Sequence, residues 1–223
     1  MSYYNGPTIV TNGLVLFVDV KNTKSCPASN TVLNDLAGNN TFTLSNITYN
    51  ADGNFSFNGS TSRIISPENS ALNTQTPTVE VWVKTNNLNQ NGFWFEKGQV
   101  NTQYSLFQEG TVIQWRMNVG TITNLSTTTA TYMSTSQWAQ VVGTYTSGTR
   151  RLYINGVLVN SDGQTGTIAT NANGSSIGVY GGFNGVRDYY YNGSLAICKV
   201  YNRALAPDEV LQNYVAIKSR FGL

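Results

Sequence analysis

Short segments in which apolar and polar residues alternate recur along almost the whole chain. In residues 78–85 (TVEVWVKT), the three valines point to one side, and Glu80, Trp82 and Lys84 point to the other, because successive side chains of a strand face opposite ways. The valines indicate a buried face, and Trp82 indicates that the second face is at least partly covered. The pattern predicts two antiparallel sheets packed against each other.

Turn residues divide these segments at short, regular intervals. Asn155-Gly156 separates two runs that are rich in β-branched and aromatic residues, and it predicts a type I′ hairpin turn, in which both central residues have positive φ. We interpret this turn as scaffold. With no recognisable repeat or linker, the 223 residues are expected to form one domain. The predicted strands are residues 13–20, 42–44, 54–58, 63–66, 78–85, 92–96, 104–109, 112–119, 121–126, 138–146, 151–154, 157–161, 176–179 and 194–201.

One convincing helical pattern occurs, at residues 206–219. Pro207 suits the first turn, the two acidic residues after it suit the positive end of the helix dipole, and Gly222 marks the stop. Two roles stay open for this helix: it covers one end of the sandwich, or it docks on a neighbouring subunit. Its predicted buried face consists of Leu211, Tyr214 and Val215, with Lys218 at the rim.

The charge of the chain excludes some partners. Charged residues make up 11% of the sequence and the net charge is +2, so we expect no binding of nucleic acid or of an anionic membrane. The first residues, MSYYNGPTIVTNGLVLFVD, lack the features of a signal peptide, and no segment has the length of a transmembrane helix. Without an export signal, Cys26 and Cys198 are expected to be free thiols.

The residue types also argue against catalysis. The chain contains no histidine, which excludes Ser-His-Asp and Cys-His mechanisms and histidine-ligated metals. Glycoside hydrolysis needs two carboxylates at one bond, but the acidic residues are scattered singly, and residues 78–85 offer only Glu80. Whether two distant carboxylates meet in space stays open. We therefore expect a protein that is not an enzyme.

Several motifs resemble those of one family. FSFNGSTSRI (55–64), TVEVWVKT, FWFEKG (93–98), WAQVVGTYTSGTRRLYINGVLVNS (138–161) and SIGVYGGFNGVRDYYYNGSLAICKVYNRALAPDEVLQNY (176–214) follow the order seen in laminin-G-like, concanavalin A-like domains, which include the pentraxins. The resemblance covers nearly the whole chain from about Gly13. It implies an all-β fold, a two-sheet antiparallel jelly-roll sandwich with a short C-terminal helix, for residues 1–223. Residues 1–12 are then an N-terminal arm.

A finer resemblance concerns the two ends of the chain. GLVLFVDVKNTKSCP (13–27) and KSRFGL (218–223) look like the ends of stand-alone laminin-G-like proteins of tailed bacteriophages. This implies a virion structural protein, a capsid decoration or a tail or fibre component, made in the host cytoplasm. Its partners are then other virion proteins or further copies in a symmetric assembly. The alternative is a carbohydrate-binding adhesin that recognises host surface glycans.

The segment from Tyr180 to Asn192 is the best candidate for contact with a ligand or partner. Tyrosine rings offer a flat apolar face and a hydroxyl, and loops on a rigid sandwich commonly carry binding residues. The other interpretation is that alternate tyrosines enter the core, so at least one of Tyr189–Tyr191 is expected to be buried. The candidate residues are Tyr180, Phe183, Asn184, Arg187, Asp188 and Tyr189.

Calcium is the metal that this composition permits, because it prefers oxygen ligands. The resemblance to pentraxins implies two calcium-holding loops, one at KGQVNTQYSLF (97–107) and one at residues 177–193. In the second loop, however, Tyr180-Gly181-Gly182 stand where acidic and amide ligands are required. We therefore expect no cofactor, with calcium as a weak possibility. The candidate ligands are Asn101, Asn184 and Asp188.

Overall fold

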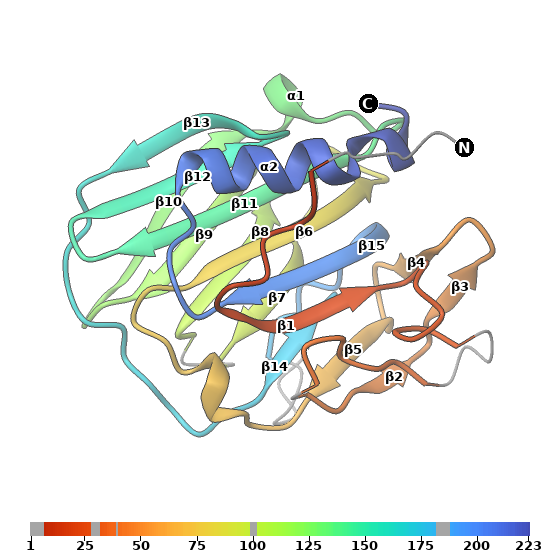
Figure 1. Cartoon of the computed structure of the whole chain (residues 1–223), viewed down its shortest axis with the longest axis horizontal. Coiled ribbons are helices and arrows are strands. Elements are labelled where there is room, and N and C mark those ends of the chain that lie inside the picture. The colour runs from red at the N-terminus through yellow and green to blue at the C-terminus, as the bar shows by residue number, and fades with distance from the viewer. Residues whose placement is uncertain (1–6, 28–31, 39, 99–101, 182–187) are drawn as a thin grey trace.

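The computed structural model describes residues 7–27, 32–38, 40–98, 102–181 and 188–223. Within these residues the chain forms two antiparallel sheets that pack face to face, with the helix α2 (Pro207–Ile217) lying over one of them (Figure 1). The predicted all-β sandwich with a short C-terminal helix is confirmed. In the described part of the chain, the helices are too short and too polar to span a bilayer.

The larger sheet has eight strands and is organised around a long strand, β15 (Asn192–Tyr201). One side of β15 pairs with β6 (Thr78–Thr85) along its whole length. The other side is shared between β4 (Asn54–Asn58) and β1 (Leu14–Asp19). The remaining strands are β11 (Ala139–Thr146), β12 (Thr149–Ile154) and β13 (Val157–Asp162), which continue outward from β6, and β3 (Thr48–Asn50) beyond β4.

The smaller sheet carries the surface that is described below. Its seven strands have the order β10 (Ile122–Thr128), β9 (Val112–Asn118), β8 (Tyr104–Glu109), β7 (Gly92–Lys97), β14 (Ser175–Ile177), β5 (Arg63–Ser66) and β2 (Thr43–Ser45). Single-turn helices occur at η1 (Ser70–Leu72), α1 (Thr129–Tyr132) and η3 (Lys218–Phe221). Each predicted strand has a counterpart. The sequence analysis did not predict β3 or α1, because both are very short and lack apolar periodicity.

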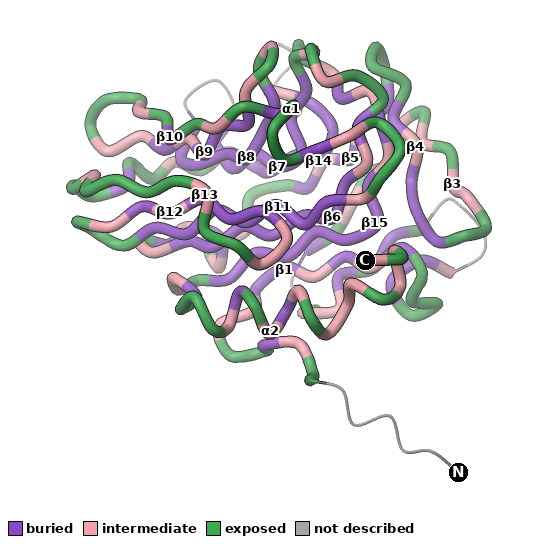
Figure 2. Tube along the Cα trace, turned by 90° about the horizontal axis from the view of Figure 1, so that it is seen from above, coloured by how far each residue is buried: buried purple, intermediate pink, exposed green. Residues whose placement is uncertain are grey.

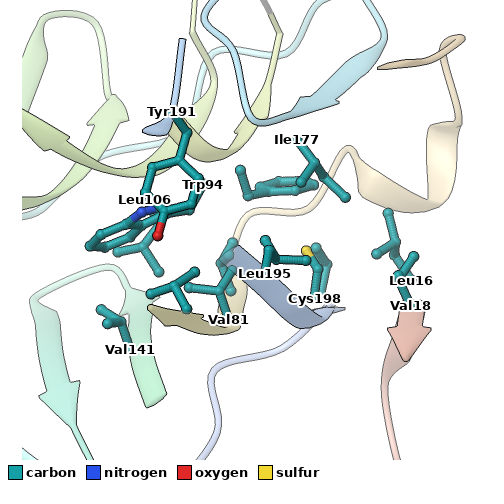
Figure 3. Packing of buried hydrophobic residues seen from close by; sticks show 14 of the residues in the cluster. Leu16, Val18, Val81, Trp94, Leu106, Val141, Ile177, Tyr191, Leu195 and Cys198 are labelled. Atoms are coloured by element: carbon teal, nitrogen blue, oxygen red, sulfur yellow. The ribbon is translucent and has the colours of Figure 1, made fainter. Parts of the chain in front are cut away.

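The core lies between the two sheets, where alternation had placed it. Figure 3 shows apolar side chains from the larger sheet meeting those of the smaller one, with Tyr191 beside Trp94. The side chains of Cys26 and Cys198 are buried and both are free thiols, as predicted. Burial raises the pKa of the Cys198 thiol, which suppresses its reactivity. The core residues labelled in Figure 3 include Leu16, Val18, Val81, Trp94, Leu106, Val141, Ile177, Leu195 and Cys198.

The turn between β12 and β13 has the predicted geometry. Asn155 and Gly156 have φ values of 51° and 76°, as a type I′ turn requires. The Asn155 side chain accepts a hydrogen bond from the backbone N–H of Gln140 at 2.9 Å, which ties the turn to β11. Asn155-Gly156 therefore shapes the larger sheet.

The helix α2 covers the outer face of the larger sheet, not an end of the sandwich as one of the two expectations had it. Figure 2 shows it as a third layer below β6 and β11. Trp82 is completely buried there, and its ring stacks on those of Phe221 at 4.5 Å and Tyr214 at 5.9 Å between centres. The second face of β6 is thus covered, as Trp82 had indicated.

The predicted buried face of this helix was wrong in part. Leu211 and Val215 are exposed, whereas Val210 and Asn213 are completely buried. The amide of Asn213 faces the sheet because it donates a hydrogen bond to the carboxylate of Glu80, with 2.7 Å between Nδ2 and Oε2. Because Asn213 has a buried polar partner in the sheet, the helix face that packs on the sheet is not the face that hydropathy alone indicates.

Glu80 is the centre of a buried polar network. Its Oε1 accepts hydrogen bonds from Lys199 Nζ and from Gln140 Nε2, both at 3.0 Å. The backbone N–H of Val10, in the predicted N-terminal arm, donates to Asn213 Oδ1 at 2.8 Å. The network joins α2 and residue 10 to β6 and β15, so the role of Glu80 is structural.

Candidate functional site

Two phenylalanine rings lie against each other on the outer face of the smaller sheet. Phe93 of β7 is opposite Phe107 of β8, and their ring centres are 4.2 Å apart with the rings nearly parallel. The outward position follows from alternation, since Leu106 on the same strand enters the core. Outward-facing phenylalanines are normally exposed, yet these side chains are only 2% and 1% exposed. Other side chains must therefore cover them.

Two tyrosines and an arginine provide this cover. The ring of Tyr180 lies 4.9 Å from that of Phe93, and the ring of Tyr189 lies 6.3 Å from it. The guanidinium of Arg116, from β9, lies over the ring of Phe107. Together they enclose a cavity of about 320 Å³, which we name the aromatic pocket. It is lined by Asn91, Phe93, Phe107, Gln108, Glu109, Arg116, Tyr180 and Tyr189.

Among the residues that the structure describes, the rim of the aromatic pocket carries one cation, Arg116, and one anion, Glu109. Arg116 donates through Nε to the side-chain oxygen of Asn124 at 2.9 Å, and its Nη2 lies 3.8 Å from Glu109 Oε2. Glu109 also accepts a hydrogen bond from the side-chain amide of Gln114. The guanidinium is thereby held over an aromatic ring, with Nε directed to Asn124 and Nη2 beside Glu109.

A buried carboxylate lies behind the pocket. Glu96, on β7, is completely buried, and its Oε2 accepts a hydrogen bond from the backbone N–H of Gly181 at 2.8 Å. Its Oε1 accepts one from Thr102 Oγ1 at 3.0 Å. Burial raises the pKa of Glu96 to about 7, although these hydrogen bonds and the charge of Arg116 oppose the rise. Glu96 therefore titrates near neutral pH and contacts the residue that follows Tyr180.

The backbone at Tyr189 is strained. Its φ is +51°, a left-handed value that bulky residues rarely adopt, and the other non-glycine described residues with positive φ are Asn46 and Asn155. The Tyr189 N–H donates to the side chain of Asp188 at 2.8 Å, and the Tyr189 carbonyl accepts from the N–H of Phe93 at 3.3 Å. Strain of this kind is concentrated at functional sites, where surrounding contacts maintain it.

The structure brings together only part of the predicted site. Tyr180 and Tyr189 both line the pocket, and Asp188 pairs with Tyr180 through the backbone. Tyr191 is completely buried, so the expectation that at least one of the three tyrosines enters the core is confirmed. Phe183, Asn184, Arg187 and Asn101 lie outside the described residues.

The residues that the strands of the smaller sheet contribute to the aromatic pocket were not predicted from the sequence. Phe93, Phe107, Arg116 and Glu109 lie on three adjacent strands, and Glu96 lies behind them. A local signal did exist, because strict alternation in 104–109 and 112–118 places Phe107 and Arg116 on the polar face. Whether these two side chains come together depends on strand register, and alternation within one strand does not indicate the register.

The calcium candidates are not assembled into a ligand set in the described part of the chain. No group of three or more acidic or cysteine side chains able to hold a metal occurs among those residues. Asp188, the one candidate that is described, uses Oδ1 to accept the N–H of Tyr189. Calcium normally takes six to eight oxygen ligands.

Comparison with known proteins gives a family match. The family model of the concanavalin A-like lectin/glucanases superfamily, of the laminin-G type, matches residues 58–211. Comparison with curated protein sequences gives no significant match.

Solved structures show the same fold. The binding domain of botulinum neurotoxin serotype D is similar with a TM-score of 0.69 and 18% identity, over 91% of this chain and 51% of that one. The binding domain of Paraclostridial Mosquitocidal Protein 1 has a TM-score of 0.69 and 21% identity, over 91% and 52%. The binding domain of botulinum neurotoxin DC in complex with SialylT has a TM-score of 0.70 and 14% identity, over 93% and 52%. This chain thus spans about half the length of each.

Proposed function

The chain belongs to the concanavalin A-like lectin/glucanase superfamily, and from this premise we propose that it is a non-catalytic domain that binds carbohydrate in the aromatic pocket. One observation carries the proposal: the stacked pair Phe93–Phe107 forms the floor of a cavity of about 320 Å³ whose walls are Tyr180, Tyr189 and Arg116. Ligand sites typically combine such an apolar lining with a few polar groups that orient the ligand.

The chemistry of the pocket suits a sugar ring. Aromatic faces pack against the C–H groups of a sugar, and those that remain accessible belong to Tyr180 and Tyr189, because the two phenylalanines are covered. The side chains of Asn91, Glu109 and Arg116 offer donors and acceptors for the hydroxyl groups of the sugar. The similar solved structures support a binding role, because they are binding domains, one of them in complex with SialylT and one in complex with rat synaptotagmin II. Because these structures are less than 25% identical to this chain, they show its fold alone. The proposal that the ligand is a carbohydrate therefore rests on the residues of the aromatic pocket.

The positions of the carboxylates support the absence of catalysis. Glu96 is opposite Ser105 in the sheet, and Glu109 lies four residues further along β8. At 3.3 Å per residue, their backbone positions are about 13 Å apart along the strand. Glu96 is also completely buried, and it is not among the residues that line the pocket.

A glycan array with wild-type protein and two single variants tests the proposal. Tyr189→Ala removes a pocket wall and is expected to abolish the signal of any bound glycan. Tyr132→Ala is the matched control, because Tyr132 is 38% exposed, as against 39% for Tyr189, and lies outside the pocket. Wild-type protein that binds no glycan, or equal signals from the two variants, would contradict the proposal.

A structural role in a phage virion is the second candidate function, and an apolar surface favours it. Leu211 and Val215 of α2 and Leu158 of β13 are exposed, and the turn at Gly156 contacts Leu211. Neighbouring apolar side chains on a surface are typical of protein contacts. In this proposal the protein is a capsid decoration or a tail or fibre component that meets virion proteins or further copies of itself.

Mass spectrometry and immunogold imaging of purified virions test the second candidate. Finding the chain in virions at a stoichiometric copy number supports it, and the copy number separates decoration from fibre. Absence from virions, together with a monomer in sedimentation at micromolar concentration, would rule it out. Virion location and glycan binding are compatible, since an adhesin is also a virion component.

A further inference from the structure

We propose that Glu96 is the positioning residue of the aromatic pocket: its ionised carboxylate holds the Tyr180 wall in place, and protonation loosens that wall and weakens ligand binding. The effect of protonation on ligand binding rests on the proposed function. The effect of protonation on the position of Tyr180 does not, because it concerns the protein without a ligand.

Strand register places Glu96 in a polar row beside the pocket. Ser176 of β14, Glu96 of β7, Ser105 of β8 and Arg116 of β9 are successive partners across the sheet. This row adjoins the aromatic row of Phe93 and Phe107. On β8 the two rows are two residues apart, at Ser105 and Phe107, so Glu96 belongs to the row next to the pocket floor while remaining completely buried.

The hydrogen bonds of Glu96 converge on the segment that carries Tyr180. The N–H of Gly181 donates to Oε2 at 2.8 Å, and Ser176 Oγ, 3.5 Å from the same oxygen, donates to the carbonyl of Val179 at 2.8 Å. Tyr180 in turn pairs with Asp188, whose carbonyl accepts the Tyr180 N–H at 3.0 Å. The carboxylate therefore anchors the residue that follows Tyr180, while Ser176 holds the residue that precedes it and Asp188 connects Tyr180 to the start of the Tyr189 wall.

The charged groups facing this carboxylate set the direction of the effect. Arg116 on β9 favours the ionised form, and among the described residues the phenol of Tyr180 is the other titratable group that interacts with Glu96. Burial opposes ionisation and outweighs Arg116 and the hydrogen bonds, so the pKa of Glu96 lies at about 7. An ionised acceptor makes a stronger hydrogen bond to an N–H than a neutral one. The Gly181 anchor is therefore strong above pH 7 and weakened below it.

The first experiment needs no ligand. In ¹⁵N-labelled protein, the Gly181 amide resonance is followed from pH 5.5 to 8.5. We expect an inflection near pH 7 in the wild type and none in Glu96→Gln, which keeps a hydrogen-bonding side chain without the charge. Glu109→Gln, the matched control on the pocket rim, keeps the inflection. A flat wild-type profile, or an inflection that survives in Glu96→Gln, would overturn the proposal.

A second variant leaves Glu96 itself intact. Thr102→Val removes the hydroxyl that donates to Oε1, and with it one interaction that favours the ionised carboxylate. We expect the Gly181 inflection to move to higher pH. An unchanged midpoint would show that the resonance follows another group, against the proposal.

Binding is measured with lactose and 3′-sialyllactose as neutral and acidic probes. We expect affinity for the probe that binds to fall about fivefold from pH 8 to pH 6. Glu96→Gln is expected to show the weaker affinity at both pH values. A bound probe whose affinity does not depend on Glu96 contradicts the proposal. If neither probe binds, that result counts against the proposed function, and the Gly181 titration still decides the role of Glu96.

Discussion

The guanidinium carbon of Arg116 lies 4.3 Å from the centre of the Phe107 ring, so an arginine of β9 covers a phenylalanine of β8. Nε is engaged by Asn124, and Glu109 lies beside Nη2. The geometry depends on the planarity of the guanidinium, which an ammonium group lacks. Arg116 is thereby both a wall of the aromatic pocket and its only described cation.

Arg116→Lys is expected to weaken glycan binding about tenfold, because the charge remains but the flat cover of Phe107 and the directed donors are lost. Isothermal titration calorimetry measures the change, and thermal unfolding is expected to show little loss of stability. Arg151→Lys is the control, since Arg151 lies on β12 of the other sheet. Equal affinities of the two variants would contradict a role for Arg116 in binding.

Tyr189→Asn is expected to separate stability from binding. Asparagine tolerates left-handed backbone better than tyrosine, so relief of strain at φ +51° should raise the free energy of unfolding by about 0.5–1 kcal/mol. The same change removes a pocket wall and should abolish glycan binding. Chemical denaturation and calorimetry measure the two effects, with Tyr132→Asn as control. A destabilised variant that still binds would show that Tyr189 has a structural role only.

The stability of the protein should fall as pH rises from 4.5 to 7. The pKa of Glu96 is about 7 in the folded chain, against 4.5 as its ordinary value, so the folded state keeps a proton that the unfolded state has released in this window. The stabilisation is present below pH 4.5 and lost by pH 7, with a total of about 3 kcal/mol. Urea unfolding at several pH values measures it.

Glu96→Gln is expected to lose this part of the pH profile, whereas Glu109→Gln should retain it. Glu109 is half-exposed on the pocket rim and takes no part in the hydrogen bonds of Glu96. A wild-type profile that is level between pH 4.5 and 7 would refute the assignment to Glu96.

Asn213→Ala is expected to destabilise the protein by about 2–3 kcal/mol, because Glu80 Oε2 and the N–H of Val10 lose a buried partner. Leu211→Ala, two residues away on the same helix, should change stability by less than about 0.5 kcal/mol, since Leu211 is exposed. Urea denaturation measures both variants. A larger loss of stability in Leu211→Ala than in Asn213→Ala would indicate instead that the helix face with Leu211 packs on the sheet.

Calcium is expected to leave the stability unchanged, because Asp188 belongs to no group of three or more acidic or cysteine side chains in the described part of the chain. Differential scanning calorimetry with excess calcium chloride and with EDTA should give the same Tm. A clear rise of Tm with calcium, reversed by EDTA, would establish a site.

Much of the fold could be predicted from local pattern. The alternation in 78–85 identified both the buried valines and the covered face with Trp82, because the period of two in a strand is a property of the backbone alone. Asn155-Gly156 likewise defined its turn, since tolerance of positive φ belongs to the residues themselves. Tyr180 and Tyr189 were predicted as contact residues because the chemistry of tyrosine suits contact wherever it lies, and this contact role stays a prediction.

The sequence by itself thus determined the strands other than β3, the buried side of most of them, the hairpin turn and the ends of the final helix. Only the tertiary structure decided that Phe93, Phe107 and Arg116 meet under Tyr180 and Tyr189, and that Asn213 rather than Leu211 faces the sheet. The physical reason is distance along the chain. Strand register and a hydrogen bond between residues 80 and 213 are set by the packing of whole sheets and a helix, and no local periodicity contains that information.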